Sequence, residues 1–141
     1  MKNLKRFVDA QNDDYESVVD ELAAGHKRGC WMWYVFPQFV GLGSSPHADL
    51  YSIKSIDEAR RYLQHDLLGS RLRACTRLVI QTKSSAIEDI FPWPDCLKFR
   101  SCMTLFARAT PDNAVFLTAL QKYYQGEPDA LTLKLLAAAD S

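Results

Sequence analysis

The residues best suited to chemistry lie in one stretch of the chain, where an aromatic run is followed by a glycine-rich loop. Trp31 and Trp33 offer flat faces against which a base or sugar could stack, and the loop can bring backbone amides close to an anion. Gln38 and Tyr51 could add the few polar contacts that orient a ligand between apolar walls. The stretch predicts a site for a small, anionic, nucleotide-like ligand, with further contacts from Gly41, Gly43 and Ser44.

The same stretch also has a purely structural interpretation. Large aromatic side chains dominate hydrophobic cores, and glycines occur wherever a loop turns tightly. Core filling is the more common role for such a run, and the spacing of the glycines is by itself a weak signal of ligand binding.

A second candidate region is the predicted helix at residues 95–108. Ser101 and Thr104 share a face with Arg108, and Lys98 borders that face, so these groups could line an anion pocket. A solvent-facing helix surface is the more common interpretation of this pattern. The opposite face is apolar and predicts core contacts for Phe99, Cys102, Met103 and Phe106.

Thiol catalysis is a weaker hypothesis for the same helix. Lys98 precedes Cys102 by four residues and could lower the pKa of its thiol, but no general base can be assigned to the pair. A packed core cysteine is therefore the preferred interpretation, and whether the protein is an enzyme stays open.

Neither a metal site nor a cofactor is predicted. The four cysteines contain no Cys-x-x-Cys pair, and the three histidines have no paired ligand spacing. In a reducing compartment the cysteines are expected to behave as small buried hydrophobic residues. They are Cys30, Cys75, Cys96 and Cys102.

Charge and hydropathy exclude several classes of partner. Seventeen basic residues balance seventeen acidic ones, so the chain lacks the excess positive charge that usually supplies affinity for nucleic acid. No apolar run approaches the roughly twenty residues of a membrane span, and the first residues resemble no signal peptide. We expect a cytoplasmic protein that binds neither nucleic acid nor membrane.

Hydrophobic periodicity predicts helices throughout, with about seven or eight helices and helical turns in one all-α domain over residues 1–141. The segment at 30–36 is apolar on every side, and helix is preferred there although its aromatic and valine content favours a strand. The expected helical segments are 4–10, 13–24, 30–36, a short helix that begins at Pro46, 55–67, 68–79, 84–90, 95–108, 110–125 and 128–139, some of which could merge.

Several helix ends carry recognisable signals. Asp13 followed by Glu16 predicts a capping box, as does Ser55 followed by Glu58, and Gly25 suits the left-handed residue that ends a helix. Gly69 is expected to permit a turn between two helices. Thr110-Pro111-Asp112 predicts the cap and first turn of another helix.

Four ordered segments resemble domain of unknown function family 1810, and the similarity covers nearly the whole chain. They are Arg6–Gln11, Trp31–Gln38, Gly41–Ser45 and Ser101–Phe106. The resemblance implies a compact all-helical bacterial protein but no activity. Similar proteins are sometimes labelled calpastatin, a disordered inhibitor, whereas the periodicity here predicts a packed domain.

One departure from the family pattern concerns Cys30, because similar proteins commonly carry histidine there. If that histidine were catalytic, this chain would be altered in activity or inactive. If it only packs or bonds locally, cysteine would be tolerated as a smaller buried group. The leading hypothesis is binding or processing of a small anionic nucleotide-like ligand between the Trp31–Ser45 segment and the helix of Ser101. The alternative is a protein-interaction module without catalytic activity.

Overall fold

The computed structural model describes residues 4–139, which contain nine α-helices and no strand. The predicted all-α class is confirmed. The helices are α1 (Lys5–Ala23), α2 (Met32–Val35), α3 (Pro46–Leu50), α4 (Ile56–Gln64), α5 (Leu68–Gln81), α6 (Ile87–Ile90), α7 (Asp95–Ala109), α8 (Ala114–Tyr124) and α9 (Ala130–Ala139). The preference for helix over strand near residues 30–36 is also correct, although α2 is only four residues long.

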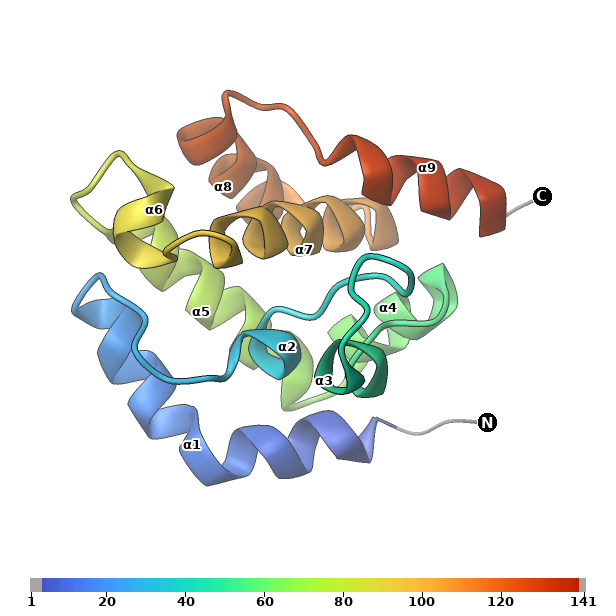
Figure 1. Ribbon diagram of the computed structural model, residues 1–141, viewed down its shortest axis with the longest axis horizontal. Coiled ribbons are helices and arrows are strands. Elements are labelled where there is room, and N and C mark those ends of the chain that lie inside the picture. Colours follow the sequence, from blue (N-terminus) through green and yellow to red (C-terminus); the bar gives the residue numbers. More distant parts are fainter. Residues whose placement is uncertain (1–3, 140–141) are drawn as a thin grey trace.

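The helices pack around α5 and α7, which cross the middle of the molecule (Figure 1). Helix α1 lies along one side of α5, α8 and α9 lie against α7, and α4 contacts both central helices. The short helices α2 and α3 and the loop between them lie between α1 and α7 in Figure 1.

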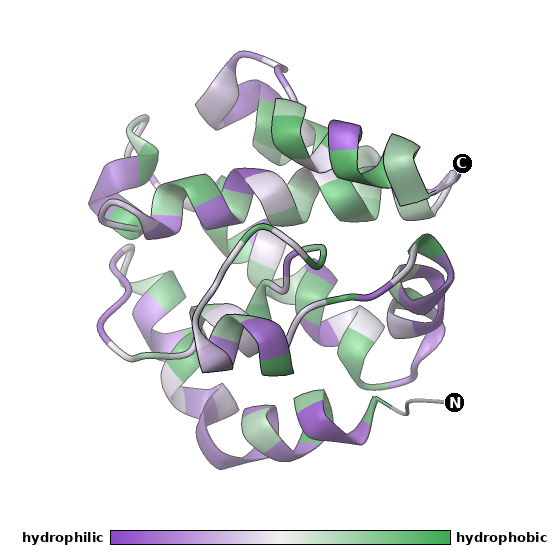
Figure 2. Cartoon of the chain, turned by 45° about the vertical axis from the view of Figure 1, so that its right-hand side comes forward, coloured by the Kyte–Doolittle hydropathy of each residue, from purple (hydrophilic) through white to green (hydrophobic). Residues whose placement is uncertain are grey.

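Buried hydrophobic residues from eight of the helices form one core. Its centre is aromatic: Phe36 meets Phe99 edge to face with ring centroids 5.1 Å apart, and Phe7 meets Tyr62 in the same way. Each such side chain contributes about 1.5–3 kcal/mol through burial. Hydrophobic residues concentrate on helix faces that meet neighbouring helices (Figure 2). The apolar face predicted for α7 is completely buried.

Helix α1 replaces the two helices expected at its position. Asp13 caps nothing, because the chain runs as one helix from Lys5 to Ala23. The Asp13–Glu16 pattern predicted a helix start here, but the helix is continuous and Gln11 is buried within it. The Gln11 side-chain amide donates to the Tyr34 carbonyl at 2.8 Å and the Tyr62 hydroxyl at 3.0 Å. The predicted end of the helix is correct, since Gly25 has a φ of +82°.

Gly69 lies at the expected junction between two helices and lets them approach each other closely. It lies in the first turn of α5, where a Cβ atom would come within 2.0 Å of the Leu63 carbonyl oxygen. Glycine is therefore required because the backbone of α5 touches that of α4. The turn itself is capped by His65, whose Nδ1 accepts hydrogen bonds from the amides of Leu67 and Leu68.

Helix α8 begins at Ala114, four residues after the predicted cap. The Thr110 hydroxyl instead accepts a hydrogen bond from the Asp112 amide, which stabilises a local turn. The Asn113 side chain then donates to the Ala107 carbonyl at the end of α7. Ser55 caps α4 as predicted, but Glu58 accepts from the Lys54 amide and the capping box is not reciprocal.

Candidate functional site

An open cavity of about 410 Å³ lies between the α2–α3 loop on one side and α7 with the start of α9 on the other. Its size is within the range of small-molecule sites. Six of the ten residues predicted to bind a ligand line this cavity, although they are separated by up to 68 positions in sequence. They are Trp33, Gln38, Gly43, Ser44, Lys98 and Ser101.

The loop wall is fixed by backbone contacts. The Ile53 amide donates to the Gln38 carbonyl and the Val40 amide donates to the Ile53 carbonyl, both at 2.9 Å. Gly43 lies so close to α3 that a Cβ atom would come within 2.6 Å of the Ala48 Cβ. The Ser45 hydroxyl accepts from the Ala48 amide and caps α3, with Pro46 in the first turn as predicted.

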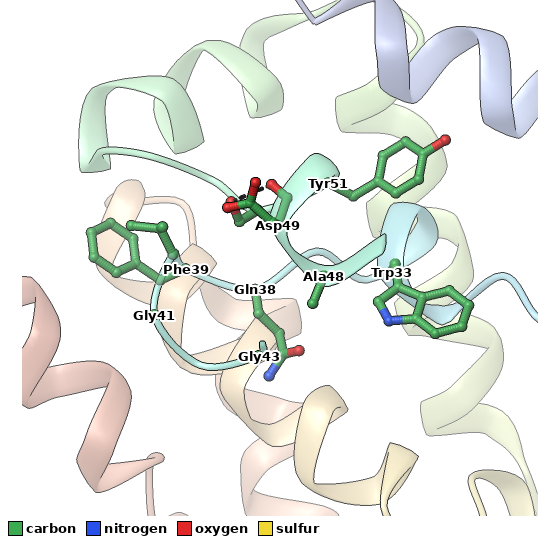
Figure 3. Close-up of a pocket in the computed structure, with 10 residues that line it drawn as sticks. Trp33, Gln38, Phe39, Gly41, Gly43, Ala48, Asp49 and Tyr51 are labelled. Carbon is green, nitrogen blue, oxygen red and sulfur yellow. Dashed lines mark hydrogen bonds between the residues drawn. The ribbon is translucent and has the colours of Figure 1, made fainter. Parts of the chain in front are cut away.

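Trp33 is half-buried at the edge of the cavity. Its ring centroid lies 5.0 Å from that of His47, with the two planes 30° apart, and the Lys98 ammonium is 5.0 Å from the Trp33 ring centroid. Within residues 4–139, neither the Trp33 indole N–H nor the side-chain amide of Gln38 makes a hydrogen bond. Figure 3 shows the indole nitrogen on the side of the ring facing Gln38, whose side chain extends toward Gly43.

Lys98 supplies the positive charge of the cavity. Its ammonium lies 3.4 Å from one oxygen of Asp95, while Lys27 lies 2.8 Å from the other. Two lysines thus share one carboxylate, so the Asp95 carboxylate offsets only part of their charge. The remaining positive charge faces the cavity through Lys98.

The far wall is positioned by buried hydroxyls. The Thr104 hydroxyl donates to the Arg100 carbonyl at 2.9 Å and accepts from the Asp129 amide at 2.8 Å, which ties the start of α9 to α7. The Ser101 hydroxyl donates to the Leu97 carbonyl. Ser101 and Thr104 are both buried, so the expectation of a solvent-facing surface is wrong for them, because α9 covers that face of α7.

The other four predicted residues do not line this cavity. Gly41 and Tyr51 line an adjacent space of about 20 Å³, room for little more than a water molecule (Figure 3). Thr104 is buried between α7 and the start of α9 and does not line the cavity. Trp31 belongs to the core, where its indole N–H donates to Oε1 of Glu21 at 2.9 Å.

Glu21 organises the segment that leads into the site. Its Oε1 also accepts from the backbone amides of Arg28 at 2.6 Å and Gly29 at 2.8 Å. Partial burial of the carboxylate acts to raise its pKa, but the two backbone hydrogen bonds, the indole bond and the charge of Lys27 outweigh it and lower the pKa. The ionised carboxylate therefore holds the 28–31 loop against α1.

Cys102 is buried in the core, as the preferred interpretation expected, and Cys30 differs from expectation. Burial raises the pKa of the Cys102 thiol well above its ordinary value, which contradicts the weaker hypothesis of an activated thiol. Cys30 is exposed, whereas a buried position was expected.

No cluster of three His, Cys, Asp or Glu side chains suited to a metal ion occurs among residues 4–139. None of the helices described is long and apolar enough to span a membrane.

Sequence reasoning missed the apolar side of the cavity. Leu42, Pro94, Leu97 and Leu131 line it, and Asp129 adds a negative charge. Leu97 and Leu131 are about half exposed, an unusual position for leucine. Their place opposite the polar residues of the loop follows only from the packing of α9 on α7, which no local pattern predicts.

Comparison with known proteins gives a family but no activity. None of the curated proteins matches the chain significantly. The crystal structure of the conserved hypothetical protein Rv1873 from Mycobacterium tuberculosis is similar, with 60% sequence identity and a TM-score of 0.94 over 95% of this chain and 96% of that one. Residues 1–136 match the family described as "Protein of unknown function (DUF1810)", and the chain therefore belongs to the DUF1810 family.

Proposed function

We propose that this protein binds a small, anionic, nucleotide-like ligand in the cavity between the α2–α3 loop and α7. The observation that carries the proposal is the convergence of Lys98, the indole N–H of Trp33 and the Gln38 amide on one cavity. The Lys98 ammonium and the Trp33 indole N–H can only donate hydrogen bonds. The indole N–H has no hydrogen-bond partner within residues 4–139, and the charge of Lys98 is only partly neutralised by Asp95. Such a set suits a phosphate or carboxylate.

The apolar wall supports a ligand with a second, uncharged part. Leu42, Leu97 and Leu131 lie in the same cavity as the polar groups, and the ring of Trp33 provides an aromatic surface beside them. A base or sugar joined to the anion would cover this wall. Because His47 already packs on the indole, stacking on Trp33 would use the part of the ring that His47 leaves open.

Asp129 is compatible with an anion because its charge is partly offset at the start of α9. Its Oδ2 accepts hydrogen bonds from the Thr132 amide at 2.9 Å and the Thr132 hydroxyl at 2.6 Å, at the N-terminus of α9. These bonds and the helix dipole stabilise the negative charge at that position. Lys98 then remains the charged group available to a ligand.

A thermal-shift screen with nucleoside monophosphates and sugar phosphates tests the proposal. At a concentration of a hundred times Kd, a true ligand stabilises the fold by about 2.7 kcal/mol. Trp33→Ala and Lys98→Gln should remove most of that shift, while Trp93→Ala, which changes an exposed tryptophan outside the cavity lining, should retain it. If no compound in the panel raises the melting temperature, the proposal is wrong.

One observation favours the alternative of a protein-binding surface. Trp93 is 74% exposed, and the half-exposed Leu97 and Leu131 lie at the nearby cavity. Contiguous exposed apolar side chains often mark partner sites. A capture experiment distinguishes the two functions. Trp93→Ala would weaken binding of a protein partner and leave binding of a small ligand unaffected, whereas Lys98→Gln would do the reverse.

A further inference from the structure

A second cavity, of about 590 Å³, lies where α4, α7 and α9 meet. Its lining consists of Ile56 and Arg60 from α4, Arg108 from α7, and Leu133, Leu136 and Ala137 from α9. None of these residues lines the cavity of Trp33. The two cavities are therefore separate candidates for ligand binding.

The charge of this second cavity is carried by two arginines. Other arginines of the chain, such as Arg61 and Arg100, pair with carboxylates, but neither Arg60 nor Arg108 contacts a carboxylate within the described range. Among residues 4–139, no acidic residue lines the cavity. Two guanidinium groups of like charge beside one cavity repel each other, and a bound anion would remove that repulsion.

The rest of the lining is aliphatic. Leu136 is buried, while Ile56 and Leu133 are half-buried, so a strip of hydrocarbon from two helices lies beside the arginines. An inorganic anion would use the guanidinium groups and leave this strip exposed to water. A ligand with a short hydrocarbon tail would cover it, at about 0.8 kcal/mol for each buried methylene.

We propose that this cavity binds a short amphipathic anion, with its phosphate or carboxylate head on Arg60 and Arg108 and its hydrocarbon tail against Ile56, Leu133 and Leu136. Arginine suits both head groups because its planar guanidinium can donate two parallel hydrogen bonds to a phosphate or to a carboxylate. The proposal is independent of the function proposed for the Trp33 cavity.

Calorimetric titration with octyl phosphate below its critical micelle concentration tests the assignment, with octanoate and inorganic phosphate measured alongside. Octyl phosphate or octanoate should bind at least tenfold more tightly than inorganic phosphate, and the tighter of the two identifies the head group. Arg60→Gln and Arg108→Gln should each weaken binding at least tenfold, and Leu133→Ser should weaken the alkyl ligand but not inorganic phosphate.

Two variants provide matched controls. Arg77→Gln changes an exposed arginine of α5 that lies outside the cavity lining, and Lys98→Gln changes the other cavity, so both should retain the wild-type affinity. Unchanged melting temperatures of the arginine variants without ligand would show that their folds are intact. The proposal is overturned if neither alkyl anion binds, if both arginine variants bind normally, or if inorganic phosphate binds as tightly.

Discussion

Nη2 of Arg6 lies 3.4 Å from each carboxylate oxygen of Glu58, a side chain that is almost completely buried. The same guanidinium donates to the carbonyl oxygens of Leu50 and Ser52. Arg6 thereby joins the start of α1 to α4 and to the end of the α3 segment. The contact also fixes one end of the loop that leads from the Trp33 cavity.

Arg6→Met should destabilise the protein by about 3–5 kcal/mol, because it leaves the Glu58 carboxylate buried without its cation. Urea denaturation at pH 7 measures the loss. Lys5→Met is the matched control, since the pair of Lys5 with Asp9 is largely exposed and should contribute less than about 1 kcal/mol. Equal losses in the two variants would contradict the role given to Arg6.

Glu21→Gln should reduce stability at pH 7 by about 1–3 kcal/mol, because three hydrogen bonds to a charged acceptor are weakened. The folded pKa of Glu21 is lowered, so its contribution is present above the ordinary value of 4.5 and is lost as pH falls through the lower folded value. The wild type should therefore lose more stability than Glu21→Gln on acidification from pH 6 to pH 3. Glu16→Gln, on the exposed side of α1, should retain the wild-type pH dependence.

Gly69→Ala tests the close approach of α4 and α5. In an open helix this change would stabilise by up to about 1 kcal/mol through helix propensity. Here the new Cβ atom would meet the Leu63 carbonyl oxygen at 2.0 Å, so we expect a loss of at least about 2 kcal/mol in thermal or urea unfolding. Ser70→Ala, at the adjacent exposed position, should change stability by less than about 0.5 kcal/mol.

Thiol labelling at pH 8 should modify one cysteine rapidly in the native protein and four after denaturation. The rapid site should be Cys30, because it is exposed, and Cys30→Ser should abolish the fast phase. Burial raises the pKa of Cys75 to about 11 and raises that of Cys102 well above its ordinary value, so both should stay protonated and unreactive. Rapid modification of Cys102 would disprove this account of the core.

Asp129→Asn tests the sign of the ligand's charge in the Trp33 cavity. Removal of the negative charge should tighten binding of an anionic ligand by severalfold, whereas a cationic ligand would bind more weakly. Asparagine can also cap a helix, so the change should leave the start of α9 in place, and ligand affinity is measured by calorimetry below the melting temperature.

The helical class and most helix ends could be predicted because local signals determine them, such as the Ser45–Pro46 and Ser55 caps. Errors arose where a polar residue has a tertiary role. Asp13 and Glu16 predicted a second helix start inside α1, where Gln11 is buried against distant residues, and the close contact of Gly69 with α4 was not predicted. In each case a distant partner determines the role of the residue.

The sequence could predict which segments form the candidate site, but not every side chain that faces it. Trp33, Lys98 and Ser101 do line one cavity, yet the sequence could not show which of Trp31 and Trp33 faces it. A helix of four residues is too short for periodicity to assign faces. The core position of Trp31 involves distant residues, since its ring packs against Phe91 and its indole N–H donates to Glu21.

Helix α9 carries part of the wall of both cavities, through Leu131 and its Asp129 cap in one and through Leu133 and Leu136 in the other. A ligand in either cavity would hold α9 in its docked position and lower the cost of ordering the second site. By thermodynamic reciprocity each ligand would then raise the affinity of the other by the same factor.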